Sequence, residues 1–424
     1  MLKIVFDATV LVDGNDMKEE RRGIYFVAKN ILREMSRRDD VEIILYASSY
    51  KIAGLERVNK EMQLDACFYR KIPFFSRLFH KFITYLCRKR FINYQRPIIR
   101  KAFALAILLS SSFCDAIFFV LNSFYKTEDA KTFFSTRTAA PRFINRDKSI
   151  KKFIVIYDLI PYVLPEYAGY RSAGWFGHLI RHLNETDYYF AISEATKKDF
   201  CTFSRSIIPS HVSISYLAVD DSFNANKGNT PLGVVAKKYG IPAKKYVMAL
   251  GSLEPRKNLL RIVRTFLTFV KENNIDDLIL VIGGGEWLNF KKIIAKQLDA
   301  SLSIEKYVFH IGYVNDGDLP VLYSNAEWFV YTSQYEGFGL PPLEAMQCGC
   351  PVIASNNSSL PEVVGDAGVM IDWDDDEQHL TAYEKFFFDE ELRRDYGRKG
   401  VERAKLFSWA KTANKMIDTM KRVV

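Results

Sequence analysis

Paired cysteines and long apolar runs are both missing from this chain of 424 residues. Its six cysteines, at positions 67, 87, 114, 201, 348 and 350, do not show the spacing of a disulfide framework or a zinc ribbon. No stretch reaches the roughly 18–20 apolar residues of a membrane-spanning helix. The start, MLKIVFDATVL, has the pattern of a strand rather than a signal peptide. We therefore expect a cytoplasmic protein in a reducing setting.

Acidic residues are absent from residues 66–114, a segment that holds ten Lys and Arg side chains interleaved with aromatic ones. Residues 1–220 carry 34 basic and 23 acidic side chains, whereas the rest of the chain has a net charge of −2. An anionic partner should therefore meet the N-terminal half. The segment predicts basic amphipathic helices on an anionic membrane, with Arg88, Lys89 and Arg90 as contacts. The same composition also suits nucleic acid, or a solvated helix face over a core.

Near-continuous apolar strands alternate with segments that have apolar residues at helical spacing. This alternation predicts an α/β fold in which parallel sheets are covered on both faces by helices. The strands form two groups on either side of a polar break at residues 220–233. We predict two Rossmann-like, doubly wound domains over residues 1–220 and 221–407, with a last helix at residues 408–424 packing back on the first. Ligands should bind in a cleft between them, at the carboxyl ends of the strands.

Two cations follow the strand YVMALGS, in the sequence GSLEPRKNL. Arg256 and Lys257 stand where a helix begins, and a helix N-terminus already favours anions. The pair could therefore clamp a phosphate group. The alternative is a solvated pair of surface cations.

A second candidate for anion binding is the turn in YEGFGLPPLEA, residues 335–345. Gly337 and Gly339 let the backbone bend and approach a ligand closely. The adjacent prolines suit the first turn of a helix, where their missing N–H groups are not needed. The amides of residues 337–340 then form an anion-binding nest.

Glu336 and Glu344 bracket this turn, although carboxylates would repel a phosphate. A carboxylate accepts two hydrogen bonds from a vicinal diol, so each could bind hydroxyl groups on one side of a diphosphate. A nucleoside diphosphate sugar has such hydroxyls on its ribose and on its hexose. The alternative for Glu344 is favourable interaction with the helix dipole.

In this order, GSLEPRKNL, LVIGGG, FHIGYV, the long motif around YEGFGLPPLEA and FSW resemble retaining glycosyltransferases of the GT4 family. The resemblance implies the GT-B fold, two Rossmann-like domains facing a central cleft. It implies that Glu344 holds the ribose, that Glu336 supports the reacting sugar, and that Arg256 and Lys257 hold the diphosphate. Further donor contacts are implied for Gly23, Tyr157, Ser193, Gly312, Tyr313, Val314, Gly337, Phe338, Gly339 and Leu340.

The chain departs from the family's pattern at several positions. Ser252 stands where many relatives have arginine, and Tyr157 where they often have histidine. Asp158 could contact the sugar or acceptor in catalysis, or only cap a turn. Ser193 could likewise be only a helix N-cap. Asp316–Asp318 (DGD) matches a metal-binding pattern, but an aspartate capping the next helix explains it better, so we expect no metal.

The resemblance implies a metal-independent hexosyltransferase that needs no cofactor beyond its nucleotide-sugar donor. GDP-mannose and a lipid-linked glycan acceptor of bacterial surface polysaccharide synthesis are the first expectation. We expect a peripheral protein on the inner face of the cytoplasmic membrane, with no nucleic-acid partner. The alternatives are another UDP-, dTDP- or GDP-sugar, or a catalytically silent scaffold. For the mechanism, same-face attack on an oxocarbenium-like centre ranks above a double displacement with Glu336 as nucleophile.

Overall fold

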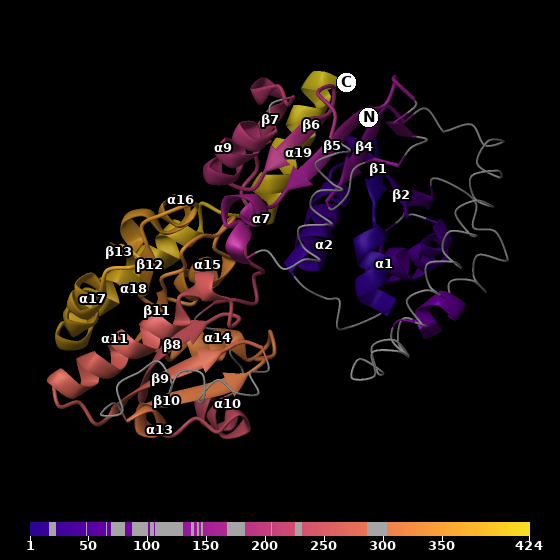
Figure 1. The fold of residues 1–424 in the computed structure, drawn as a ribbon. Helices are drawn as coiled ribbons and strands as arrows, with labels where there is room; N and C mark the ends of the chain where they lie inside the picture. The colour runs from indigo at the N-terminus through magenta and orange to yellow at the C-terminus, as the bar shows by residue number, and fades with distance from the viewer. Residues whose placement is uncertain are drawn as a thin grey trace.

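The computed structural model shows two α/β domains joined side by side (Figure 1). The description below covers residues 1–16, 23–47, 49–64, 66–68, 81–86, 101, 106, 130–136, 140–141, 144–145, 147–167, 183–204, 206–224, 231–285 and 303–424.

The N-terminal domain is built on a seven-stranded sheet. Its strands are β1 (Leu2–Asp7), β2 (Val41–Tyr46), β3 (Cys67–Phe68), β4 (Thr132–Ser135), β5 (Lys151–Ile156), β6 (Tyr188–Ala191) and β7 (Val212–Ile214). They lie in the order β3-β2-β1-β4-β5-β6-β7, and every pair is parallel. The helices described in this domain are α1 (Thr9–Asp16), α2 (Gly23–Ser36), α3 (Leu55–Glu61), α7 (Ile160–Val163) and α9 (Glu194–Phe203).

The C-terminal domain has a six-stranded parallel sheet in the order β10-β9-β8-β11-β12-β13. Its strands are β8 (Lys245–Leu250), β9 (Leu278–Gly283), β10 (Val308–Gly312), β11 (Trp328–Tyr331), β12 (Val352–Ser355) and β13 (Val369–Ile371). The described helices are α10 (Leu232–Tyr239), α11 (Leu259–Glu272), α13 (Ile304–Tyr307), α14 (Leu319–Ser324), α15 (Leu340–Gln347), α16 (Leu360–Val364), α17 (Asp376–Phe388) and α18 (Glu390–Ala404). The last helix, α19 (Trp409–Val423), follows α18.

Strand β9 shows why the strand sequences are apolar without a break. All six of its residues are buried, and successive side chains enter different hydrophobic clusters. Ile279 and Val281 pack in one cluster, whereas Leu278, Leu280 and Ile282 pack in the other, with α11 and α17. A strand buried on both faces needs apolar residues at every position. The predicted α/β fold with two parallel sheets is confirmed.

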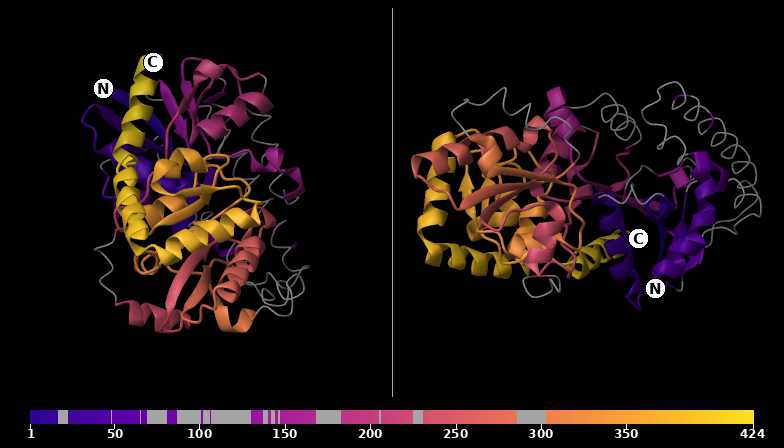
Figure 2. Two further views of the ribbon diagram at one scale, coloured as in Figure 1. Left: turned by 90° about the vertical axis from the view of Figure 1, so that its left-hand side faces the viewer. Right: turned by 90° about the horizontal axis from the view of Figure 1, so that it is seen from below.

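Helix α19 returns to the N-terminal domain and packs against α2 (Figure 2). Met416, Ile417 and Met420 are fully buried in this contact region. At its edge, the Arg38 guanidinium donates to Asn414 Oδ1 over 2.8 Å, and Lys421 pairs with Asp40. The chain therefore crosses between the domains twice, after β7 and again between α18 and α19.

Most of the basic segment at residues 66–114, including Arg88, Lys89 and Arg90, lies outside the described residues. Residues 81–86 are helical and have two different faces. Ile83 and Leu86 are buried, whereas Phe82 is 48% and Tyr85 55% exposed. Within the part of the chain that is described, no helix has the length and apolar character needed to cross a membrane.

Candidate active site

The clamp residues lie directly after the central strand β8. Arg256 and Lys257 belong to a short 3-10 turn, Pro255–Lys257, and α11 begins only at Leu259. Asn258 connects the two in a left-handed conformation (φ 58°). Its side-chain amide donates to Thr332 O over 3.0 Å and fixes the turn to the neighbouring strand end. The two cations therefore precede the helix instead of forming its first turn.

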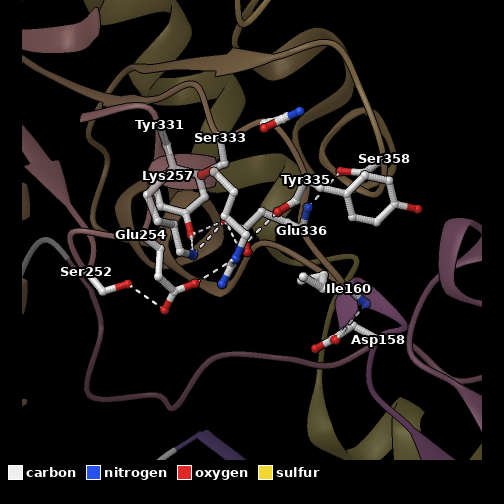
Figure 3. A network of polar contacts seen from close by, with 12 residues as sticks. Asp158, Ile160, Ser252, Glu254, Lys257, Tyr331, Ser333, Tyr335, Glu336 and Ser358 are labelled. Atoms are coloured by element: carbon white, nitrogen blue, oxygen red, sulfur yellow. Dashed lines mark hydrogen bonds and ion pairs between the residues drawn. The ribbon is translucent and has the colours of Figure 1, made fainter. Parts of the chain in front are cut away.

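Both cations are bound to Glu336, which lies beside them in the turn after β11. Figure 3 shows Lys257 and Tyr331 next to its carboxylate. Glu336 Oε1 is 2.6 Å from Lys257 Nζ and 3.3 Å from Arg256 Nη1. The Tyr331 hydroxyl also donates to Oε1 over 2.9 Å. Arg256 further binds Glu254 Oε2 over 2.8 Å and Tyr335 O over 3.0 Å. The sequence predicts that Glu336 and the two cations belong to one site, and they do lie together. The contact with Tyr331 was not predicted.

Burial and charge act against each other in this cluster. Burial alone would raise the pKa of Glu336, but Lys257 and Arg256 outweigh it and hold the pKa below its usual value. Burial would lower the pKa of Lys257, but Glu336 raises it. All three groups are therefore charged at neutral pH, in a site where Glu336 is only 8% exposed. Fixed charges in a dry site act strongly on a bound reactant.

Hydroxyl groups on both sides hold the carbonyls of the glycine turn. Ser193 Oγ and Thr196 Oγ1, from the N-terminal domain, donate to Gly337 O over 2.8 and 3.2 Å. Ser359 Oγ lies 3.0 Å from Glu336 O and 2.8 Å from Phe338 O. In a trans peptide the N–H points opposite to the C=O. These hydroxyls therefore also fix the direction of the N–H groups that follow.

Gly337 lies against the backbone of the other domain. A Cβ atom at this position would stand 2.6 Å from Tyr157 O and 2.8 Å from Asp158 Cβ. Gly339 has a φ of 108° and forms the N-cap of α15, followed by prolines in the first turn as predicted. The glycines thus permit a left-handed turn and a close approach between the domains.

Asp158 faces this cluster from the N-terminal domain (Figure 3). Its Oδ1 accepts from Ile160 N over 3.1 Å, so it does cap the turn before α7. Burial raises its pKa, and the negative charge of Glu336 adds to this effect, while Arg256 opposes it. Tyr157, beside it, is half-buried.

Glu344 lies one turn into α15 and is not paired with a cation in the described structure. Tyr323 hydroxyl donates to its Oε2 over 3.2 Å. Burial, with a smaller contribution from the charge of Asp316, raises the pKa of Glu344 to about 7. The side chain nevertheless remains partly accessible.

The remaining predicted residues lie in different surroundings. Gly312 has a φ of 68°, Tyr313 is 65% exposed and Val314 is buried. Ser193 is fully buried and caps α9 through a bond from Thr196 N, so its hydroxyl contacts the turn and not the solvent. Gly23 is the exposed first residue of α2.

The prediction that an aspartate of DGD caps the next helix is correct for the position but wrong for the hydrogen bond. Asp318 occupies the N-cap position of α14, but its side chain makes no capping bond. Its carboxylate instead binds Lys238 and, over 2.8 Å, the Tyr239 hydroxyl. Two nearby donors on α10 compete successfully with the helix amides. No group of three or more metal-binding side chains occurs among the described residues.

Sequence comparison finds a family match in the C-terminal domain and several curated relatives. Residues 235–403 match the family model "Glycosyl transferases group 1". The "O-antigen chain mannosyltransferase B" of Escherichia coli is 37% identical over 187 residues, which are 44% of this chain and 48% of that protein. The "Serotype-specific mannosyltransferase WbdA" of the same species is 27% identical over 278 residues, 65% of this chain and 34% of that protein. The matches thus span half or less of these relatives' length.

Solved structures match the whole chain in fold. WaaG, described as a glycosyltransferase involved in lipopolysaccharide biosynthesis, has a TM-score of 0.59 at 12% identity, covering 99% of both chains. HepE of Anabaena, solved with UDP and glucose, has a TM-score of 0.64 at 14% identity, covering 100% of both. Residues 235–403 are therefore similar to the glycosyl transferases group 1 family, within a chain that has the two-domain GT-B fold.

Proposed function

We propose that the protein is a retaining glycosyltransferase that moves a hexose, mannose from GDP-mannose, to a lipid-linked glycan in surface polysaccharide synthesis. The observation that carries this proposal is the buried Lys257–Glu336–Arg256 cluster at the junction of the two domains. The O-antigen mannosyltransferases among the relatives support the choice of sugar. A structural neighbour solved with UDP-glucose supports a nucleotide-sugar donor.

The cluster suits a reaction in which a sugar–phosphate bond breaks. Negative charge then grows on the leaving diphosphate, where Arg256, Lys257 and the amides of residues 337–340 stabilise it. Positive charge grows on the sugar carbon, where the ionised Glu336 is the stabilising group. Because hydroxyls of both domains fix the turn, these groups do not need to reorganise during the reaction. The two cations and the amides of the turn can therefore stabilise the charge of the leaving diphosphate.

The substitution at the sugar carbon can follow either of two mechanisms. In the first, the acceptor hydroxyl attacks from the face of the leaving group and gives its proton to a phosphate oxygen. In the second, Glu336 is the nucleophile of a double displacement. That route needs a second carboxyl group. Asp158 is a candidate for it, because its raised pKa and the lowered pKa of Glu336 separate an acid from a base.

We propose that the acceptor binds to the N-terminal domain and its basic segment, residues 66–114. One relative is named for transfer to a diphospho-undecaprenol-linked sugar, which supports a lipid-linked acceptor. Phe82 and Tyr85 are exposed on the helical residues 81–86, which also carry the exposed cation Lys81. Such a surface suits the interface of an anionic membrane. We therefore propose peripheral binding to the membrane's inner face.

Donor binding should strengthen between pH 6 and pH 8. Ribose hydroxyls that donate to Glu344 favour its ionised form, so binding lowers its pKa from about 7 and releases a proton. The affinity should therefore rise about tenfold over this range. Isothermal titration of GDP-mannose into the protein at several pH values measures this, with UDP- and dTDP-sugars compared at pH 8.

The matched variant is Glu344→Gln, which should bind the donor more weakly and with no pH dependence over this range. If another nucleotide sugar binds and GDP-mannose does not, the choice of mannose is wrong while the reaction class stands. Absence of binding by every nucleotide sugar would contradict the proposed function. Equal pH dependence in the variant would remove Glu344 from the ribose site.

A further inference from the structure

Two side chains of the C-terminal domain make three hydrogen bonds to one short helix of the N-terminal domain. Helix α9 (Glu194–Phe203) faces α16 at the junction (Figure 1). Glu362 on α16 accepts hydrogen bonds from two amides of α9, and Tyr335 donates its hydroxyl to Asp199. In return, Ser193 and Thr196 donate to Gly337 O. Helix α9 and its N-cap Ser193 therefore connect the first domain to the proposed site.

Glu362 occupies the N-terminus of α9 in the manner of a bound anion. Its Oε2 accepts from Glu194 N over 2.7 Å, and its Oε1 accepts from Ala195 N over 2.8 Å. Thr196 N, the next amide, donates to Ser193 Oγ over 2.9 Å. The first amides of a helix have no partner within it, and a carboxylate there also interacts favourably with the helix dipole. Two of these three amides are thus satisfied from the other domain.

The short helix that carries Glu362 also holds the proposed catalytic turn. Ser359, directly before α16, binds the carbonyls of Glu336 and Phe338. At the other end, the Arg403 guanidinium donates to Glu362 O over 2.7 Å and to Val363 O over 3.1 Å. Helix α16 is therefore fixed to its own domain at both ends. Thr196 of α9 donates its hydroxyl to Tyr157 O over 3.1 Å, directly before Asp158. A contact between α16 and α9 therefore sets where Asp158 stands relative to Glu336.

We propose that Glu362 is a positioning residue, whose carboxylate docks the N-terminus of α9 and so closes the two domains around the reacting sugar. This role rests on the proposed transferase function. In this role Glu362 acts through α9 and not by contact with the reactants. It assembles the groups contributed by the two domains, and its contact breaks when the domains separate to admit donor or release product.

Glu362→Ala and Glu362→Gln test this role by two independent readouts. Hydrogen exchange resolved to single amides, with saturating GDP-mannose, should show exchange at Glu194 and Ala195 about tenfold faster in Glu362→Ala. The amide of Thr196 is the internal control and should be unchanged, because its partner Ser193 lies in the same domain. In transfer assays, kcat should fall about tenfold, while the Kd of the donor changes much less. Glu362→Gln, which keeps one acceptor oxygen, should be intermediate.

Glu194→Gln is the matched control, because it removes an exposed carboxylate from the same helix turn without removing the docking group. It should match the wild type in both readouts. Wild-type exchange at Glu194 and Ala195 in Glu362→Ala would overturn the docking contact. Faster exchange with unchanged kcat would overturn the positioning role. Absence of transfer by the wild-type protein would contradict the transferase function, and the exchange readout would still decide the contact.

Discussion

Glu336→Gln is expected to lower kcat for sugar transfer roughly 10²–10³-fold. The wild-type carboxylate is kept ionised by Lys257 and Arg256 in a nearly dry site. A neutral amide of the same shape cannot stabilise positive charge on the sugar carbon, and it cannot act as a nucleophile. The Kd of the donor should change far less, because the two cations remain to bind the diphosphate. Steady-state kinetics and calorimetry on the same preparation measure the two quantities.

Glu254→Gln is the control for this substitution. Glu254 binds the same Arg256 guanidinium and the Ser252 hydroxyl, but half of its side chain is exposed. Screening by solvent makes its charge far less effective, so less than a tenfold loss of kcat is expected. Equal losses in the two variants would mean that Glu336 acts only by holding Arg256 in place. Full activity of Glu336→Gln would remove it from the chemistry.

Gly337→Ala should abolish most transfer without unfolding either domain. The added methyl group would stand 2.6 Å from Tyr157 O and 2.8 Å from Asp158 Cβ, and neither atom is the far end of a flexible side chain that could move aside. We expect the domains to separate to relieve this clash, which takes Asp158 away from Glu336. We expect kcat/KM to fall at least about 100-fold. The Tm should change by only a few degrees, because the methyl group enters no domain core.

Transfer kinetics and thermal unfolding measure these effects, and X-ray scattering shows whether the domains have separated. Gly317→Ala serves as the control, since a Cβ atom at Gly317 meets nothing within 4 Å. It should leave both transfer and scattering as in the wild type. Normal transfer by Gly337→Ala would mean that the close approach of the domains is not needed for the reaction.

The sequence could predict what depends on neighbours along the chain. Continuous apolar strands predicted the parallel sheets, and a glycine with two prolines predicted the turn and helix start at residues 337–342. The cations and Glu336 were placed together because both follow strands of one parallel sheet. Strand ends at one edge of a sheet are a strong guide to a site.

Contacts between residues far apart in the chain could not be predicted in this way. For Ser193 the sequence left two roles open, a donor contact and a helix N-cap; it does cap a helix, but its bond to Gly337 O depends on how the two domains meet. Nothing in the sequence indicates the contact of Glu362 with α9, because a glutamate in a short helix is most often solvated. Asp318 caps nothing through its side chain, because Lys238 and Tyr239 are folded against it. Such contacts are set by packing and not by local spacing.

The most direct test of the account is the product formed from labelled GDP-mannose and membranes that contain lipid-linked glycan. The labelled mannose should appear in the lipid-linked fraction, and its new bond should keep the anomeric configuration of the donor, as read by NMR of the released glycan. Inversion at the anomeric carbon would contradict the retaining mechanism. If no nucleotide sugar gives a labelled product, the proposed transferase function is contradicted.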